Sequence, residues 1–187
     1  MSFMIDEYLS TIDVSTLDSF RSLLCEASEK QLEDISNRYG KASGLNKEWI
    51  YDDGVQANMI RWLGEELILI SLYHIFEIKL KEIIRAKQSR SNPEKNDKTI
   101  ALHRWDELKN HMPDIVKSTN DFQQINVLRV LVNCFKHSGV VNTELNKLEP
   151  SFGNVDGEIR CDLNELYEKY KMCAINVISQ TYEQSKL

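Results

Sequence analysis

Three side chains at helical spacing are the strongest chemical signal in this sequence. Arg129, Asn133 and His137 stand four residues apart, in a segment whose apolar residues repeat at the period of an α-helix. With Lys136 beside them, they are predicted to form a ridge on one helix face. A histidine exchanges protons near neutral pH, and a guanidinium binds phosphate and stabilises developing charge. The combination indicates metal-independent phosphodiester chemistry, with Asn133 orienting a hydroxyl group or a base.

The same four residues also suit an ordinary surface helix. Polar side chains cover the solvent face of most amphipathic helices. A histidine in the last helical turn, which is the place predicted for His137, interacts favourably with the negative end of the helix dipole. Spacing alone leaves the catalytic and the structural interpretation both open.

A second polar ridge is predicted inside the most apolar run of the chain, residues 67–80. Tyr73, Glu77 and Lys81 are again four residues apart. A buried carboxylate is costly unless it is paired, so Glu77 is expected to have Lys81 or Arg129 as its cationic partner. Tyr73 and Glu77 are therefore supporting candidates for the site, and an ordinary structural ion pair is the alternative.

The segment VLRVLVNCFKHSG, Val127 to Gly139, resembles the signature helix of HEPN-superfamily proteins. Residues 66–84 are similar to the long first core helix of that group, and residues 105–115 to a connecting segment before the motif. The resemblance implies a helical bundle. For active members it implies metal-independent RNA cleavage by an arginine and a later histidine, usually in a dimer that pairs two motifs. It assigns the histidine role to His137 and the polar role to Asn133.

The arginine of that motif is displaced in this sequence. The shortest version of the motif would place it at position 132, which is Val132, whereas Arg129 lies one helical turn earlier. Two interpretations follow. Either Arg129 serves from the preceding turn, or the motif is degenerate and supports binding or dimerisation.

A bundle of helices is needed to position these side chains. Helices are predicted over residues 17–39, from a start between 47 and 58 to residue 87, and over residues 100–110, 122–136 and 163 onward. Ser15 with Asp18 resembles a capping box, and Asp162 with Glu165 marks the start of the last helix. Residues 89–98 are predicted to be a loop. Residues 140–161 are predicted to be a long irregular connection, with room for a small hairpin.

The predicted fold class is therefore all-α, with four main helices and one short helix. One domain is expected over residues 1–187, with a HEPN-like core at about 58–187 and the helix over 15–40 packed on it. His74 is expected to be a hydrogen-bonded packing residue, and Trp49, Trp62 and Trp105 are expected to be core or interface anchors rather than platforms for base stacking.

Composition narrows the possible functions. The net charge of −6 argues against a dedicated DNA-binding protein, and the most apolar run is too short to cross a bilayer. A cytoplasmic location is expected, because no signal peptide is recognised. The four cysteines lack metal-type spacing, and so do His103 and His111, so no disulfide, metal or other cofactor is expected. Seven basic residues in 79–98 predict either a solvated helix end or a patch for RNA phosphates or an acidic partner.

Two functions are consistent with this sequence. The first is a HEPN-like endoribonuclease or RNA-binding component of a toxin–antitoxin or phage-defence system. In it, Arg129 would hold the scissile phosphate and His137 would act as general acid and base. The second is a non-catalytic helical module that acts through a homodimer or a protein partner, including an immunity or antitoxin type. The position of the Arg129 guanidinium relative to the His137 imidazole discriminates between them.

Overall fold

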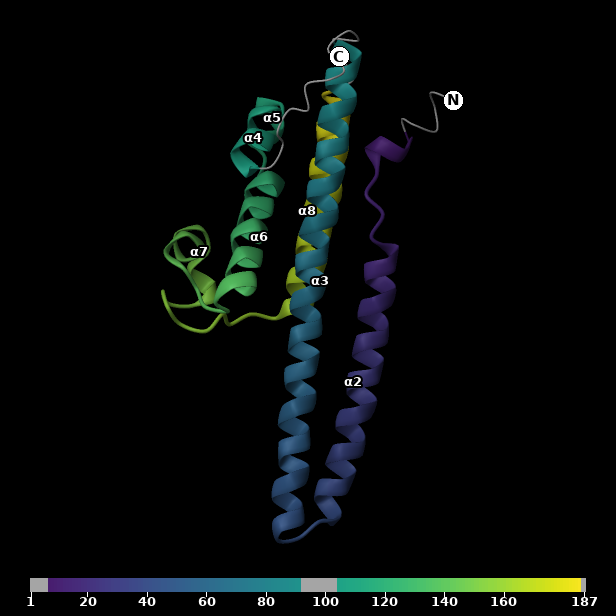
Figure 1. Cartoon of the computed structure of the whole chain (residues 1–187), viewed down its shortest axis with the longest axis vertical. Coiled ribbons are helices and arrows are strands. Elements are labelled where there is room, and N and C mark those ends of the chain that lie inside the picture. The colour runs from purple at the N-terminus through teal and green to yellow at the C-terminus, as the bar shows by residue number, and fades with distance from the viewer. Residues whose placement is uncertain (1–6, 92–103, 186–187) are drawn as a thin grey trace.

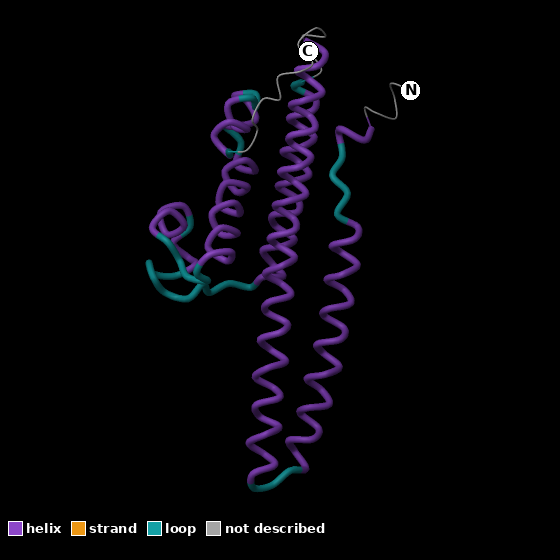
Figure 2. Tube along the Cα trace, in the orientation of Figure 1, coloured by secondary structure: helices purple, strands orange, loops and turns teal. Residues whose placement is uncertain are grey.

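The computed structural model describes residues 7–91 and 104–185, and it is built from helices joined by loops. The prediction of an all-α bundle is confirmed (Figure 1). Four helices are long: α2 (Ser15–Lys41), α3 (Leu45–Ser91), α6 (Asn120–His137) and α8 (Leu163–Glu183). The short ones are α4 (Trp105–Asn110), α5 (Asp114–Lys117), α7 (Thr143–Leu148) and the 3-10 turn η2 (Pro150–Phe152). Figure 2 shows that helices and loops account for the whole described trace.

The central element is α3, which has 47 residues and serves two parts of the molecule. Its second half lies in the core, where Leu69, Leu72, Phe76 and Leu80 have no exposed surface. These side chains pack with the apolar faces of α6 and α8. Burying such residues is the main source of stability, at roughly 1.5–3 kcal/mol for each large apolar side chain.

The first half of α3 leaves the core and runs beside α2 as a two-helix extension (Figure 1). We call this extension, residues 26–41 of α2 and 45–64 of α3, the arm. The two helices are joined by a short turn in which Gly44 has a φ of 59°, a conformation that glycine adopts without strain. Within the arm, Ile35 and Ala57 are among the few buried apolar residues, so its packing is thin.

Polar contacts fix α2 against α3 and α8 where the arm joins the core. The Asn164 side chain accepts a hydrogen bond from Arg21 Nε at 2.9 Å and donates one to Glu65 Oε1 at 2.8 Å. Glu65 is buried, and it also accepts from Arg61 Nε at 2.9 Å. The buried carboxylate therefore has the partners that its desolvation demands.

A second set of contacts joins α2 to α8 one turn away. Asp18 accepts hydrogen bonds from the hydroxyl of Tyr167 at 2.8 Å and from Lys171 Nζ at 3.0 Å. Burial raises the pKa of Asp18, but these two hydrogen bonds and the charges of Lys171 and Arg21 outweigh it, so the pKa lies below its ordinary value. Asp18 is thus held as a carboxylate between the two helices.

The start of α2 corrects the capping prediction. Ser15 is the first residue of the helix rather than its cap, and its backbone N–H donates to Asp13 Oδ1 at 2.9 Å. Asp18 does not reach back to the helix start, because its carboxylate is taken by α8. At the last helix the prediction is confirmed, since Asp162 accepts from the backbone N–H groups of Asn164 and Glu165.

The connection between α6 and α8 is more ordered than predicted. It contains α7 and η2, and where the sequence left room for a small hairpin there is one isolated bridge between Val140 and Glu158. The predicted loop over 89–98 is wrong for its first residues, because α3 continues to Ser91, and residues 92–98 lie outside the described part. Residues 100–103 of the predicted short helix also lie outside it, and α4 begins at Trp105.

Residues 8–14 lie along the core half of α3. Lys79, which is buried, donates to the backbone carbonyl of Tyr8 at 2.8 Å and lies 3.4 Å from the centre of its ring. Leu9, Ile12 and Val14 are also buried. Among the described helices, none has both the length and the apolar character that crossing a membrane requires.

Candidate functional site

The predicted site lies on α6, whose ends are set by local sequence. Thr119 caps the helix by accepting a hydrogen bond from the backbone N–H of Phe122. At the other end, Gly139 has a φ of 68°, and its N–H donates to the carbonyl of Cys134. The apolar residues of α6 face the core, so the polar residues face outward as the spacing predicted.

The Arg129 side chain is bound to residues of its own helix and of α7. Its Nε donates to Asn126 Oδ1 at 3.0 Å, and its Nη2 pairs with Glu144 Oε1 at 2.5 Å. The guanidinium carbon lies 5.9 Å from the centre of the Trp105 ring, and only 17% of the side chain is exposed. The guanidinium is therefore neutralised by a carboxylate and packed against an aromatic ring.

Asn133, Lys136 and His137 are exposed at the C-terminal end of the same helix. His137 lies two turns after Arg129, about 12 Å along the helix axis. Arg129 is drawn toward Asn126, which is in the opposite direction from His137. The structure therefore leaves Asn133, Lys136 and His137 exposed at the helix end, whereas the Arg129 guanidinium is paired with Glu144.

The second predicted ridge, on α3, lies near Arg129. Glu77 pairs with Lys81 at 3.0 Å. Of the two expected cationic partners, Lys81 and Arg129, Lys81 is therefore the one that the structure shows. Tyr73 is buried, and its ring centre lies 6.5 Å from that of Trp105. Burial and the charge of Glu77 raise the pKa of Tyr73, and Arg129 acts in the opposite direction. Tyr73 therefore stays protonated at neutral pH.

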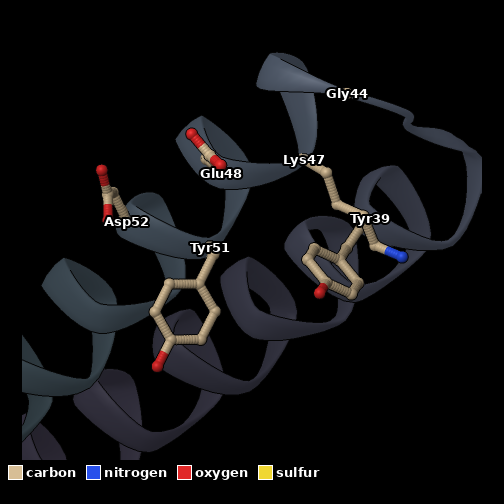
Figure 3. A pocket seen from close by; sticks show the side chains of 6 residues that line it. All are labelled: Tyr39, Gly44, Lys47, Glu48, Tyr51 and Asp52. Atoms are coloured by element: carbon tan, nitrogen blue, oxygen red, sulfur yellow. The ribbon is translucent and has the colours of Figure 1, made fainter.

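Metal chemistry finds no support in the described part of the chain, where no three His, Cys, Asp or Glu side chains converge as a metal site would require. A shallow hollow lies at the turn of the arm, lined by Tyr39, Gly44, Lys47, Glu48, Tyr51 and Asp52 (Figure 3). In it Lys47 Nζ lies 4.6 Å from the centre of the Tyr39 ring. These exposed side chains offer a ligand little enclosure.

The feature that sequence reasoning missed is an exposed apolar face on α3. Six large side chains on it are between 54% and 74% exposed: Leu45, Trp49, Met59, Ile60, Leu63 and Leu67. At 3.6 residues per turn they lie on one side of the helix, away from the face that contacts α2. We call these six residues the α3 seam. The signal was present in the sequence, because Ile60, Leu63, Leu67 and Ile70 alternate spacings of three and four.

This face bears on two expectations, those for Trp49 and His74. Trp49 lies on the α3 seam and His74 lies further along the same side of the helix, and both are exposed. The expectation that His74 is a packing residue is wrong, and Trp49 is not a core anchor, because α2, α6 and α8 cover the other sides of α3. The alternative of Trp49 as an interface anchor stays a prediction. Trp105, in contrast, is half-buried and stacks on Phe122 with ring centres 5.6 Å apart.

Comparisons with known proteins found no match: no protein-family model, no curated protein and no solved structure matches the chain.

Proposed function

We propose that this protein is a helical interaction module that binds a protein partner through the α3 seam. The observation that carries the proposal is the exposure of the six apolar side chains that form the seam. Together they present on the order of 700 Å² of apolar surface, taking about 200 Å² for each large side chain when fully exposed. Met59, Ile60, Leu63 and Leu67 form a continuous part of about 450 Å², and the exposed Asp52 and Gln56 separate it from Leu45 and Trp49. The largest apolar patch of a typical monomer is about 300–600 Å². A surface of this extent is typical of an interface.

The arm provides a second reason. α2 packs against one side of α3 there, and few arm residues are buried. A two-helix hairpin that extends beyond the core adds little to the stability of the core. Its length and its apolar residues are better accounted for by a partner that covers it.

The test is site-specific crosslinking in the cells that make the protein. A photo-reactive amino acid is placed at Leu63 on the α3 seam, or at Met172 on α8, which has the same 54% exposure. The proposal predicts discrete crosslinked products from position 63 and none from position 172. Equal yields from both positions, or no product from position 63, would contradict it.

A second candidate function is a HEPN-like, metal-independent endoribonuclease or RNA-binding component of a toxin–antitoxin or defence system. What favours it is the exposure of His137 together with Asn133 and Lys136 at one helix end. His137 would exchange protons with the reacting hydroxyl, and Lys136 would attract phosphate. Arg129 would join this site only after leaving Glu144, to which it is paired.

This candidate is tested by incubating the purified protein with total RNA and a metal chelator. RNA cleavage that is lost in His137→Ala and kept in His111→Ala would support it, since His111 is an exposed histidine outside the helix. Circular dichroism checks that both variants remain folded. Equal cleavage by the parent protein and His137→Ala would remove His137 from any catalytic role.

A further inference from the structure

We infer that the partner on the α3 seam is a second copy of this chain, with the two α3 helices antiparallel and crossing between Leu63 and Leu67. This inference rests on the proposed function, and it specifies the partner and the geometry. Four observations carry it: the spacing of the seam residues, their self-complementary order, the charge at the two ends of α3, and the area exposed.

The apolar residues of α3 have the spacing that is typical of a helix packed against another helix. Ile60, Leu63, Leu67 and Ile70 follow one another at intervals of three, four and three residues. This alternation keeps a narrow apolar stripe facing a partner helix over two to three turns. Ile70 also packs against the core, which fixes the orientation of the stripe relative to the rest of the molecule.

The order of residues along the stripe is self-complementary when the second helix runs in the opposite direction. A two-fold axis between positions 63 and 67 places Leu63 against the partner's Leu67, and Ile60 against the partner's Ile70. Further out, Trp49 meets the partner's Lys81, where a cation can lie over an indole ring. Each of these contacts occurs twice in the dimer.

Charge favours the antiparallel arrangement over the parallel one. The arm end of the stripe is flanked by Glu48 and Asp52, and the core end carries the exposed Arg85 together with Lys81, which is paired with Glu77. An antiparallel pair brings the acidic end of each helix to the basic end of the other. A parallel pair would place like charges opposite each other at both ends, which disfavours association.

Among the residues that the structure describes, the side of α3 that bears the stripe remains exposed beyond the α3 seam. The exposed side chains continue from the α3 seam into the core half of the helix as His74 and Ile78. In Figure 1, α8 lies behind α3, and no described segment crosses in front of α3.

The exposed area is close to what a stable dimer buries. A standard protein interface removes about 800 Å² from each partner. The α3 seam supplies on the order of 700 Å² of this from apolar side chains alone. His74, Ile78 and the charged ends add polar surface at the rim, which is the arrangement that specific interfaces show.

The oligomeric state of the purified chain is the first test. Size-exclusion chromatography with light scattering is expected to give twice the 21.8 kDa of the chain. Leu63→Glu is expected to halve the mass at the same protein concentration, because it buries two carboxylates near the two-fold axis. Met172→Glu, at an equally exposed site on α8, is expected to leave the dimer intact. Unchanged circular dichroism verifies that Leu63→Glu is folded.

The orientation is tested by disulfide crosslinking. Gln56→Cys and His74→Cys are purified separately and oxidised alone or as a mixture, with the parent protein as the control for its four native cysteines. The antiparallel geometry predicts a covalent dimer in the mixture and little in either variant alone. A covalent dimer of Gln56→Cys alone would indicate the parallel arrangement and overturn the proposed geometry.

The outcomes separate this inference from the proposed function. A parent protein that is a monomer at all accessible concentrations, or a dimer that Leu63→Glu does not disrupt, overturns the second-copy proposal. If position 63 then still crosslinks in cells to a different protein, the interaction module stands with another partner. If position 63 gives no crosslink either, both proposals fall.

Discussion

Replacing Asn164 with alanine tests whether the polar network fixes the position of α2. Asn164 is the only described side chain that touches both Arg21 of α2 and Glu65 of α3 through hydrogen bonds, at 2.9 and 2.8 Å. Alanine removes both bonds and leaves the buried Glu65 carboxylate with Arg61 as its remaining partner. The cap of α8 is not affected, because it is made by Asp162.

The expected magnitude follows from these contacts. A hydrogen bond to a charged group contributes about 1.5–3 kcal/mol, and the partly exposed Arg21 falls at the low end of that range. Alanine returns up to about 0.7 kcal/mol through its higher helix propensity. We therefore expect the free energy of unfolding to fall by about 2–4 kcal/mol, which corresponds to a decrease in Tm of roughly 5–12 °C for a domain of this size.

The assay is urea unfolding followed by circular dichroism, with parent and variant at one protein concentration so that self-association contributes equally. Asn58→Ala is the matched control, because Asn58 is exposed and donates only to a carbonyl of its own helix. Its effect is expected to stay within about 0.5 kcal/mol. If Asn164→Ala lowers the free energy of unfolding no more than Asn58→Ala does, the polar network does not fix the position of α2, and the reasoning is refuted.

Two further predictions concern the same fold. The pKa of Glu168 is lowered by its hydrogen bond with Lys171, and the pKa of Asp18 is also below its ordinary value of 3.8. Both carboxylates therefore stabilise the fold fully above about pH 4.5. They lose this contribution as the pH falls through their folded pKa values. Urea unfolding between pH 7 and 3 is expected to show a steeper acid loss for the parent protein than for Lys171→Met. Thr119→Ala removes the cap of α6 and is expected to cost about 1 kcal/mol in the same assay at pH 7.

Each of these two predictions has a clear contrary result. Parallel pH profiles for the parent protein and Lys171→Met would show that the ion pairs of Asp18 and Glu168 do not couple to folding. For the cap, Thr143→Ala is a suitable comparison, because Thr143 is the first residue of α7 and Asn142 provides that cap. Equal stabilities of Thr119→Ala and Thr143→Ala would mean that the α6 cap is energetically neutral.

Local signals in the sequence predicted the helices well. The apolar period and the residues at the helix ends located α6 to within two residues at its start and one at its end, and Asp162 marked the start of α8. Such features depend on neighbours within about four residues, which a sequence displays directly. The predicted start of α3, between residues 47 and 58, was at least two residues too late, because the apolar residues of the arm face solvent rather than a core and give a weaker helical pattern.

The candidate site was less predictable, because it depends on contacts between distant segments. The spacing of Arg129 and His137 correctly placed both on the outer face of α6, but it could not show that Glu144 would occupy the guanidinium. Glu144 lies in a segment without helical period in the sequence, where α7 was not expected. In the same way, the contact of Asp18 with α8 spans 149 residues, and no local rule anticipates it.

The absence of a break in α3 has a mechanical consequence. The helix contains no proline between Leu45 and Ser91 and rises about 70 Å from the turn of the arm to its far end. Because α3 has no hinge, we expect a force applied at the turn of the arm to tilt the helices packed around residues 68–84. We therefore expect that a partner bound at the turn of the arm would shift the core half of α3 together with the helices packed on it, α6 among them.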